Sequence, residues 1–226
     1  MNKKIISFSL WGQDPKYTVG AIRNAELASE LYPDWTCRFY CAASVPSQII
    51  YQLEDFKNVE IFHRDDWGDW TSMFWRFEPA SEDTVDIMIS RDTDSRLSLR
   101  EKAAVDEWES SSFGFHIMRD HPYHKYKILG GMWGAKKGIL PQMKTLIDDF
   151  SQKDSYGTDY EFFNNVIFEL IHDKTLVHDE FFAKKSFPLE RDLTADVVFV
   201  GEVFDHQENF NKHHRDVLFG YLNKSK

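Results

Sequence analysis

Short apolar runs alternate with amphipathic segments along most of the chain, and this alternation predicts an α/β fold. Apolar runs bounded by turn residues indicate strands. Strands are expected at residues 4–10, 36–43, 59–63, 85–90, 113–118, 175–178 and 197–200. Apolar positions that recur with helical spacing, between capping residues and prolines, indicate helices. Helices are expected at residues 16–31, 46–53, 70–77, 98–108, 140–150 and 159–171.

The expected sheet is mainly parallel and flanked by helices, because helical segments connect most of the strands. The sequence contains no internal repeat, low-complexity tract or linker, so residues 1–226 are expected to form a single domain. A chain of 226 residues is long enough to enclose one sizeable core. The last dozen residues are rich in Lys, His and Asn and are expected to fray.

Composition narrows the classes of function. A hydrophobic fraction of 42% with 15% aromatic residues is typical of a folded globule. The net charge of −10, without any basic stripe, argues against nucleic-acid binding. An acidic protein that binds a phosphate-bearing substrate needs a bridging cation or a local basic cluster. The charge balance therefore makes acidic clusters worth examining as cation sites.

The two cysteines and the hydropathy indicate a cytoplasmic protein. Cys37 and Cys41 fall in one expected strand, about 13 Å apart, which is too far for a disulfide. Buried free thiols fit a reducing compartment. No apolar run is long enough to span a bilayer, so we expect no transmembrane segment, and any membrane association would be peripheral.

The segment with the clearest chemical meaning is 86–94, an apolar run that ends in Asp92 and Asp94. Alternate residues of a strand point to the same side, and open α/β sheets bind ligands beyond the carboxyl ends of their strands. Two carboxylates there repel each other unless a hard cation lies between them, and oxygen ligands suit Mg²⁺ or Mn²⁺. The alternative is a polar turn in which Asp94 caps the backbone.

The order of several segments resembles that of GT-A-type nucleotide-sugar-dependent glycosyltransferases, in particular small domains of viral and bacterial polysaccharide synthesis. The matching segments are an N-terminal βαβαβ half, Asp92-Thr93-Asp94 after a central strand, the glycine-rich stretch 130–134, the helix opening at 157–163 and the stretch 201–205. The resemblance implies a single GT-A-like domain, with a nucleotide-binding half at residues 1–95 and an acceptor half at residues 96–226.

The resemblance also implies a reaction. The protein would transfer a hexosyl or deoxyhexosyl group from a nucleotide-sugar donor, with a UDP-sugar as the expected donor, to a glycan or other hydroxyl acceptor. The reaction would depend on Mn²⁺ or Mg²⁺, held by Asp94 as the firmer ligand. Asp92 would contact the ribose or the metal, and His206 would supply a ligand from the C-terminal region. A cation of this kind neutralises the charge that develops on the leaving diphosphate.

Two further groups of residues follow from the resemblance. The residues expected to contact the donor are Ser9, Trp11, Gly12, Arg76, Arg91, Asp92, Thr93, Gly130 and Gly131. A carboxylate at the start of the helix near 159–171 would take the proton of the attacking hydroxyl, as an inverting transfer requires. Asp159 and Glu161 are the catalytic candidates, and Asp159 matches the family's position better.

Several of these residues have structural interpretations that the sequence leaves open. Residues 158–161 have the form of a capping box, which would assign Glu161 to helix capping. Arg91 and Arg96 can bind phosphates or balance the aspartates. The glycines of 130–134 fit close contact with a ligand or a tightly packed strand.

The remaining assignments also have competing interpretations. Arg76 can reach the nucleotide or lie on the surface of a helix with an aromatic core face. His178 and Asp205 compete with His206 as metal ligands. Three tryptophans of the aromatic-rich region are expected in the core rather than at the ligand, namely Trp67, Trp70 and Trp75.

Two other functions remain open. A phosphatase of the haloacid-dehalogenase type would use Asp92 as a nucleophile, although that fold opens with its catalytic strand and here three expected strands come first. A non-catalytic sugar-binding protein on the same fold is the second alternative.

Overall fold

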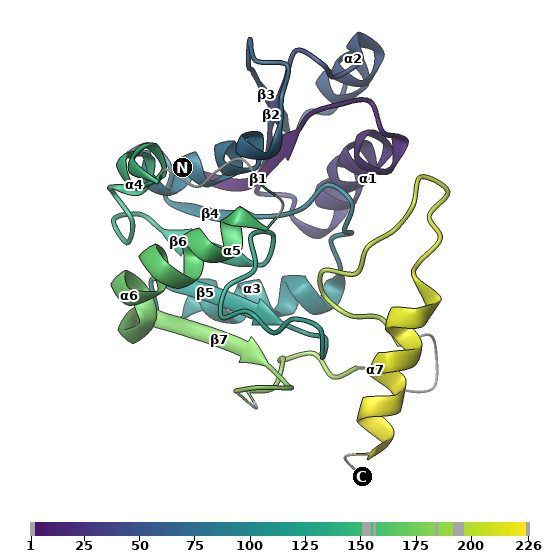
Figure 1. The fold of residues 1–226 in the computed structure, drawn as a ribbon, viewed down its shortest axis with the longest axis vertical. Coiled ribbons are helices and arrows are strands. Elements are labelled where there is room, and N and C mark those ends of the chain that lie inside the picture. The colour runs from purple at the N-terminus through teal and green to yellow at the C-terminus, as the bar shows by residue number, and fades with distance from the viewer. Residues whose placement is uncertain (1–2, 151–154, 156, 184, 192–196, 225–226) are drawn as a thin grey trace.

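The computed structural model describes residues 3–150, 155, 157–183, 185–191 and 197–224, which form an α/β domain around one seven-stranded sheet (Figure 1). The strand order is β3-β2-β1-β4-β6-β5-β7, and β6 runs antiparallel to both of its neighbours while the other pairs are parallel. The strands are β1 (Lys4–Leu10), β2 (Thr36–Cys41), β3 (Val59–His63), β4 (Ile87–Ser90), β5 (Phe115–Arg119), β6 (Trp133–Lys136) and β7 (Thr175–Asp179).

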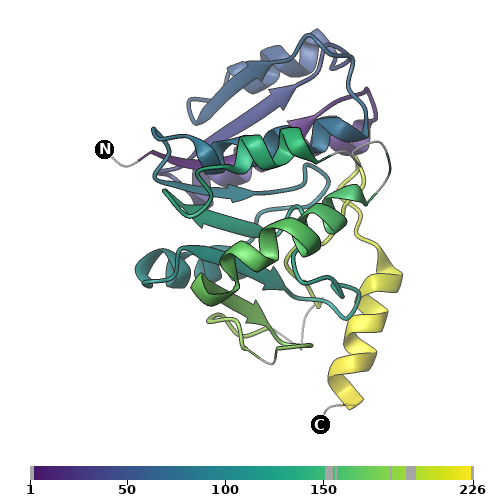
Figure 2. The ribbon, with the colours of Figure 1, turned by 60° about the vertical axis from the view of Figure 1, so that its left-hand side comes forward.

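Helices cover both faces of this sheet. Helices α1, α2 and α3 pack on one face, whereas η1, α4 and the run from α5 to α6 pack on the other, where α4, α5 and α6 cross the sheet in Figure 2. The helices are α1 (Pro15–Leu31), α2 (Ser47–Glu54), η1 (Trp70–Ser81), α3 (Leu99–Ser110), α4 (Met143–Asp149), α5 (Thr158–Phe162), η2 (Phe163–Ile167), α6 (Phe168–Ile171), η3 (His172–Lys174) and α7 (Lys212–Lys224). Among the described residues, no helix is both long and apolar enough to cross a membrane.

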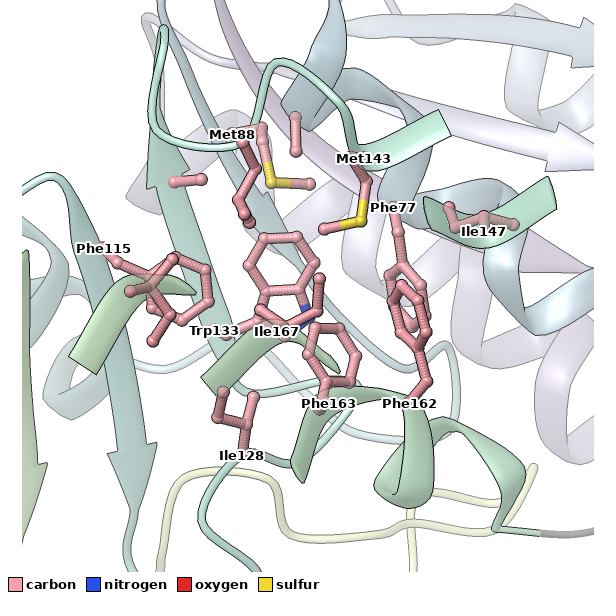
Figure 3. Packing of buried hydrophobic residues seen from close by; sticks show 14 of the residues in the cluster. Phe77, Met88, Phe115, Ile128, Trp133, Met143, Ile147, Phe162, Phe163 and Ile167 are labelled. Atoms are coloured by element: carbon pink, nitrogen blue, oxygen red, sulfur yellow. The ribbon is translucent and has the colours of Figure 1, made fainter. Parts of the chain in front are cut away.

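An aromatic cluster fills the space between the sheet and the second helical layer (Figure 3). Trp133 of β6 stacks on Phe115 of β5 with ring centroids 5.3 Å apart. Phe77 of η1 contacts both Trp133 and Phe163, at centroid distances of 5.6 and 4.9 Å. Burying large side chains of this kind contributes about 1.5–3 kcal/mol each. The cluster therefore fixes η1 and the α5–α6 region against the central strands.

The sequence predicts most of this architecture, but it does not predict strand β6, and two expectations near the C-terminus are wrong. Residues 197–200 are not a strand: Val197 and Phe199 are buried in a small cluster with Leu218 of α7 instead of pairing with the sheet. The last dozen residues do not fray along their whole length, because the described part belongs to α7, where Leu218 is fully buried. Helix α7 has few apolar positions among many charged residues, so its hydrophobic pattern does not predict a helix.

The two cysteines lie where the sequence placed them. Cys37 and Cys41 are buried free thiols in β2. Burial raises the pKa of both thiols, to about 12 for Cys41, so neither forms a thiolate at neutral pH.

Two histidines form a buried pair between β5 and β7. Nε2 of His116 lies 2.8 Å from Nδ1 of His178, and Trp108 stacks on the His116 ring. Burial holds the pKa of His116 well below its usual value, and His178 lowers it further. Burial also lowers the pKa of His178, against the opposing effect of Glu107. The folded state therefore keeps this pair neutral, whereas the unfolded chain binds protons below a pH of about 6.5.

This difference predicts that acid destabilises the fold. Because the unfolded state binds more protons, the free energy of unfolding should fall as the pH drops below about 6.5, with a slope approaching about 1.4 kcal/mol per pH unit for each buried histidine. Urea denaturation at several pH values between about 8 and 5.5 measures this slope. The variant His116→Phe keeps a ring against Trp108 and should give a shallower slope; equal slopes in the two proteins would contradict the assignment.

Candidate functional site

A cavity of about 600 Å³ opens at the carboxyl ends of β1 and β4, the two central parallel strands. Open α/β sheets bind ligands at this edge. Many of the residues selected from the sequence line this cavity: Ser9, Trp11, Arg76, Asp92, Thr93, Asp94, Gly130, Gly131 and Asp159. Residues that are far apart in the chain therefore meet in one place.

The aspartate loop, residues 91–95, follows β4 as a turn and is held from one side by α1. Asn24 of α1 donates from its side-chain amide to the carbonyl oxygens of Thr93 and Ser95, at 3.3 and 2.8 Å. Its side-chain oxygen accepts a hydrogen bond from the N–H of Leu97 at 3.1 Å. A Cβ at Gly20 would lie 2.0 Å from the carbonyl oxygen of Thr93. Close packing on α1 thus orients the aspartates.

The C-terminal segment holds the aspartate loop from another side. The N–H of Phe204 donates to the carbonyl oxygen of Asp94 at 2.9 Å. Arg96, just after the loop, forms an ion pair with Glu208 at 2.7 Å. Arg96 is therefore engaged with Glu208 rather than with the cavity. These contacts attach residues 203–208 to the same loop that carries Asp94.

Three carboxylates and two cationic side chains face the cavity. Arg76 of η1 forms an ion pair with Asp92, and its second terminal nitrogen lies 3.8 Å from Asp159. Lys16, at the start of α1, contacts Asp94 with its ammonium nitrogen 2.6 Å from the carboxylate. Arg76 is 7% exposed, so it is not a surface residue of an aromatic helix. Both cations are already paired with carboxylates of the site.

The surroundings disfavour negative charge on two of these carboxylates. Burial raises the pKa of Asp94, and the charge of Asp92 raises it further, against the opposing effect of Lys16. Burial also raises the pKa of Asp159, and Arg76 opposes that rise. Carboxylates that cluster in this way gain from an additional cation.

Gly130 and Gly131 make room for the carboxylates. A Cβ at Gly131 would lie 1.9 Å from Oδ2 of Asp92, and a Cβ at Gly130 would lie 2.1 Å from Oδ2 of Asp159. The same atom at Gly130 would lie 2.8 Å from the guanidinium of Arg76. In this structure the glycine pair therefore lets acidic side chains approach the backbone before β6.

The residues present fit a divalent cation that shares its ligands with a substrate. Among the described residues, no group of three or more His, Cys, Asp or Glu is arranged to hold a metal. Mg²⁺ is commonly bound through one or two carboxylates together with substrate phosphates, instead of a complete protein cage. Asp92 and Asp94, facing one cavity with an excess of negative charge, match that incomplete type of site.

Asp159 lies at the start of α5, but not in a capping box. The N-cap residue is Gly157, with φ of 82°, and no side chain caps the helix. Thr158 is already the first helical residue, so the capping-box interpretation of 158–161 is wrong. Asp159 points into the cavity, 7% exposed, whereas the neighbouring Glu161 is exposed and does not line it.

Three other selected residues lie outside the cavity lining. The buried guanidinium of Arg91 forms an ion pair at 2.7 Å with Glu101 of α3, rather than with an aspartate of the loop. The N–H of Gly12 donates to Oγ of Ser44 at 2.8 Å in a turn with positive φ. His206 is exposed in the turn after Asp205.

The structure also settles the surroundings of the competing residues. His178 belongs to the buried pair with His116, and Asp205 accepts backbone hydrogen bonds from its own turn at 2.8 and 2.9 Å. The expectation that Trp67 and Trp70 are core residues is wrong, because they are 71% and 44% exposed. Trp70 lines the cavity and contacts Trp11 edge-on at a centroid distance of 6.5 Å.

Sequence reasoning missed several residues of the cavity lining. Lys16 follows the first strand at the start of a helix, a position that a search for cations near that strand end could have found. Others lie in the loop between β5 and β6, in α5 or around the start of α7: Tyr126, Tyr160, Asn211 and His214. Nothing in the local pattern assigns these residues to the cavity, because their positions depend on how distant segments pack.

Neither the family models nor the curated protein sequences match this chain. Solved structures match at low identity. A glycosyltransferase involved in the glycosylation of the major capsid of PBCV-1 is 16% identical, with a TM-score of 0.53 over 79% of this chain and 82% of that chain. A mannosyltransferase from Pyrobaculum calidifontis, in complex with GDP-Man and Mn²⁺, is 11% identical, with a TM-score of 0.55 over 79% of this chain and 55% of the other.

A third similar structure spans nearly the whole chain. The 4-diphosphocytidyl-2C-methyl-D-erythritol synthase from Anaerococcus prevotii is 10% identical, with a TM-score of 0.54 over 98% of this chain and 99% of that chain. At such identities these likenesses establish the fold alone. They confirm the predicted class, a single GT-A-like α/β domain with a mainly parallel sheet.

The geometry at the glycine pair yields a direct prediction. Gly131→Ala should displace Asp92 or the backbone before β6, at a cost of about 1–3 kcal/mol in stability, because the new Cβ overlaps the carboxylate. Thermal unfolding measures this cost. The control is Gly220→Ala in α7, where nothing lies within 4 Å of the new Cβ and stability should be equal or higher. Equal thermal stability of the two variants would contradict the close contact between Gly131 and Asp92.

Proposed function

We propose that this protein is a divalent-metal-dependent glycosyltransferase that moves a hexosyl or deoxyhexosyl group from a UDP-sugar to a hydroxyl of a glycan. The observation that carries the proposal is the charge balance of the cavity, where three carboxylates face two cationic side chains that are already paired. A sugar-nucleotide diphosphate adds further negative charge, so its binding requires an additional cation.

In this proposal Asp94 and Asp92 hold Mn²⁺ or Mg²⁺ on the cavity side of the aspartate loop. The bound ion would neutralise the negative charge that develops on the departing nucleoside diphosphate. Lys16 lies within reach of the same charge, because its ammonium already contacts Asp94 at 2.6 Å. Asn24 and the backbone of Phe204 keep the aspartate loop in position while the ligands exchange.

The nucleotide is assigned to the β1 end of the cavity. Trp11 and Trp70 provide aromatic surface there, and Ser9 lies at the base of the same wall. The hydroxyl of Ser9 accepts a hydrogen bond from the backbone N–H of Arg76 at 3.1 Å, and this bond connects η1 to β1. Aromatic side chains with an apolar body and a polar edge suit a nucleobase.

Asp159 is assigned the role of base. Its carboxylate lies beside Gly130, across the guanidinium of Arg76 from Asp92. Arg76 favours the ionised form of Asp159, which burial alone would disfavour, so the carboxylate can accept the proton of an attacking hydroxyl. Glu161 is the weaker candidate, because its side chain is exposed outside the cavity lining.

Nucleotidyl transfer is a second candidate, because the likeness to the diphosphocytidyl synthase spans nearly the whole chain. Such a reaction takes up a nucleoside triphosphate, which carries more negative charge than a sugar diphosphate. The only cationic side chains in the described lining of the cavity are Lys16 and Arg76, and each is paired with an aspartate. The charge balance therefore favours glycosyl transfer.

The metal assignment predicts a specific loss on substitution. Asp94→Asn should weaken Mn²⁺-dependent binding of UDP by about 10- to 100-fold, because a ligand to the ion loses its charge. Calorimetric titration of UDP with Mn²⁺ or with a chelator measures the effect. Asp106→Asn is the matched control, since that carboxylate lies on the surface of α3 and pairs with Lys102. If UDP binds equally well without the metal, and Asp94→Asn leaves that binding unchanged, the metal site is contradicted.

The base assignment predicts a contrast between neighbours on α5. Asp159→Asn should lower the rate of UDP release from a UDP-sugar in the presence of acceptor by about 10²- to 10⁴-fold, with UDP binding retained. Glu161→Gln should leave the rate near that of the parent protein. Assays over a panel of UDP-, GDP- and dTDP-sugars identify the donor. The reverse order of effects would transfer the role to Glu161, and release of pyrophosphate from nucleoside triphosphates alone would favour nucleotidyl transfer.

A further inference from the structure

The end of the cavity away from β1 is formed by segments that the proposed donor site does not use. The loop between β5 and β6 contributes His124 and Tyr126, α5 contributes Tyr160, and the start of α7 contributes His214. Asp159 lies in the same lining, next to Tyr160 in the chain. A molecule bound at this end would therefore lie beside the proposed base.

His124 has a defined hydrogen-bonding role. Its Nδ1 accepts a hydrogen bond from the backbone N–H of Asp120 at 3.1 Å, so in the neutral ring the proton is on Nε2. Burial lowers the pKa of His124 to about 3, and His121 lowers it further, so the ring stays neutral. No hydrogen bond to Nε2 occurs among the described residues. His124 is therefore a neutral hydrogen-bond donor among the residues that line the cavity.

Tyr126 and Tyr160 form an aromatic surface at the same end. Their rings are stacked with centroids 4.2 Å apart and an angle of 14° between the planes. Tyr126 is 48% exposed, although it is a large aromatic residue. Stacked, partly exposed tyrosines offer an apolar face with polar hydroxyl edges. A sugar ring has the same two features, an apolar C–H face and a rim of hydroxyls.

Positive charge is lacking at this end. The described residues that line it include no Lys or Arg, and the cavity's cationic side chains, Lys16 and Arg76, are paired with aspartates. Arg119, the last residue of β5, pairs with Asp179 at 2.7 Å, and Lys125 and Lys127, on either side of Tyr126, are outside the cavity lining. Sites that bind phosphate groups use arginine or lysine, so this end is not built for a phosphorylated acceptor.

We propose that this end of the cavity is an acceptor subsite for an uncharged sugar, bound by the Nε2–H of His124 and by an outer face of the stacked Tyr126–Tyr160 pair. The assignment rests on the proposed glycosyl transfer and adds the class of acceptor. A neutral glycan fits, whereas sugar phosphates, polyol phosphates and lipid phosphates do not. The carboxylate of Asp159 contributes to this selectivity, because it repels an anionic acceptor while it attracts a hydroxyl proton.

The test compares neutral and phosphorylated probes on the same protein. Methyl glycosides of glucose, galactose and mannose, and the corresponding 6-phosphates, are titrated by saturation-transfer NMR with and without UDP and Mg²⁺. At least one neutral glycoside should bind at least tenfold more tightly than its 6-phosphate. His124→Ala and Tyr126→Ala should each weaken that binding by about tenfold while UDP binding stays unchanged. Tyr51→Ala, an exposed tyrosine on α2 outside the cavity lining, is the control and should have no effect.

The outcomes separate this inference from the proposed function. Tighter binding of the phosphorylated probes, or glycoside binding that both cavity variants leave unchanged, would overturn the acceptor subsite. A protein that binds UDP but none of the neutral glycosides would also overturn it and leave the donor site intact. Glycoside binding without any UDP binding would instead support the subsite and contradict the glycosyltransferase function.

Discussion

The structure depends on the convergence of Asp92, Asp94 and Asp159 in one cavity at the edge of the sheet. Carboxylates placed so close together repel each other, and burial adds to that cost. Arg76 and Lys16 offset the repulsion by pairing with the aspartates of the loop after β4. Gly130 and Gly131 have no side chains, which leaves the space that the carboxylates of Asp159 and Asp92 occupy.

The rest of the fold holds these charges in position. Parallel pairing of β1 and β4 brings the ends of both strands to the same edge, and the aromatic cluster around Trp133 fixes η1 and α5 against them. Asn24 orients the aspartate loop from one side, and the segment that begins at Val203 holds it from another. A site of this kind needs a rigid frame, because a small displacement of one carboxylate changes the charge balance of the whole cavity.

Much of this could be predicted from the sequence, because the predictable parts are local. The run that ends in Asp94 and the alternation of strands and helices are patterns within short segments, and they identified the fold and the aspartate loop. The structure changes the interpretation of Arg76 and Arg91, since the buried guanidinium of each pairs with a carboxylate of another segment. The α7 region was missed because its place in the cavity results from packing against a loop 93 residues earlier in the chain.

The central claim is that the aspartate loop binds a divalent cation together with a nucleoside diphosphate. A crystal structure of the protein with UDP and Mn²⁺, with anomalous diffraction to locate manganese, tests this most directly. The account predicts one manganese peak within about 2.5 Å of a carboxylate oxygen of Asp94 and of the diphosphate, with Lys16 moved from its contact with Asp94. UDP bound in the cavity without manganese, or manganese bound away from the aspartate loop, would contradict the account.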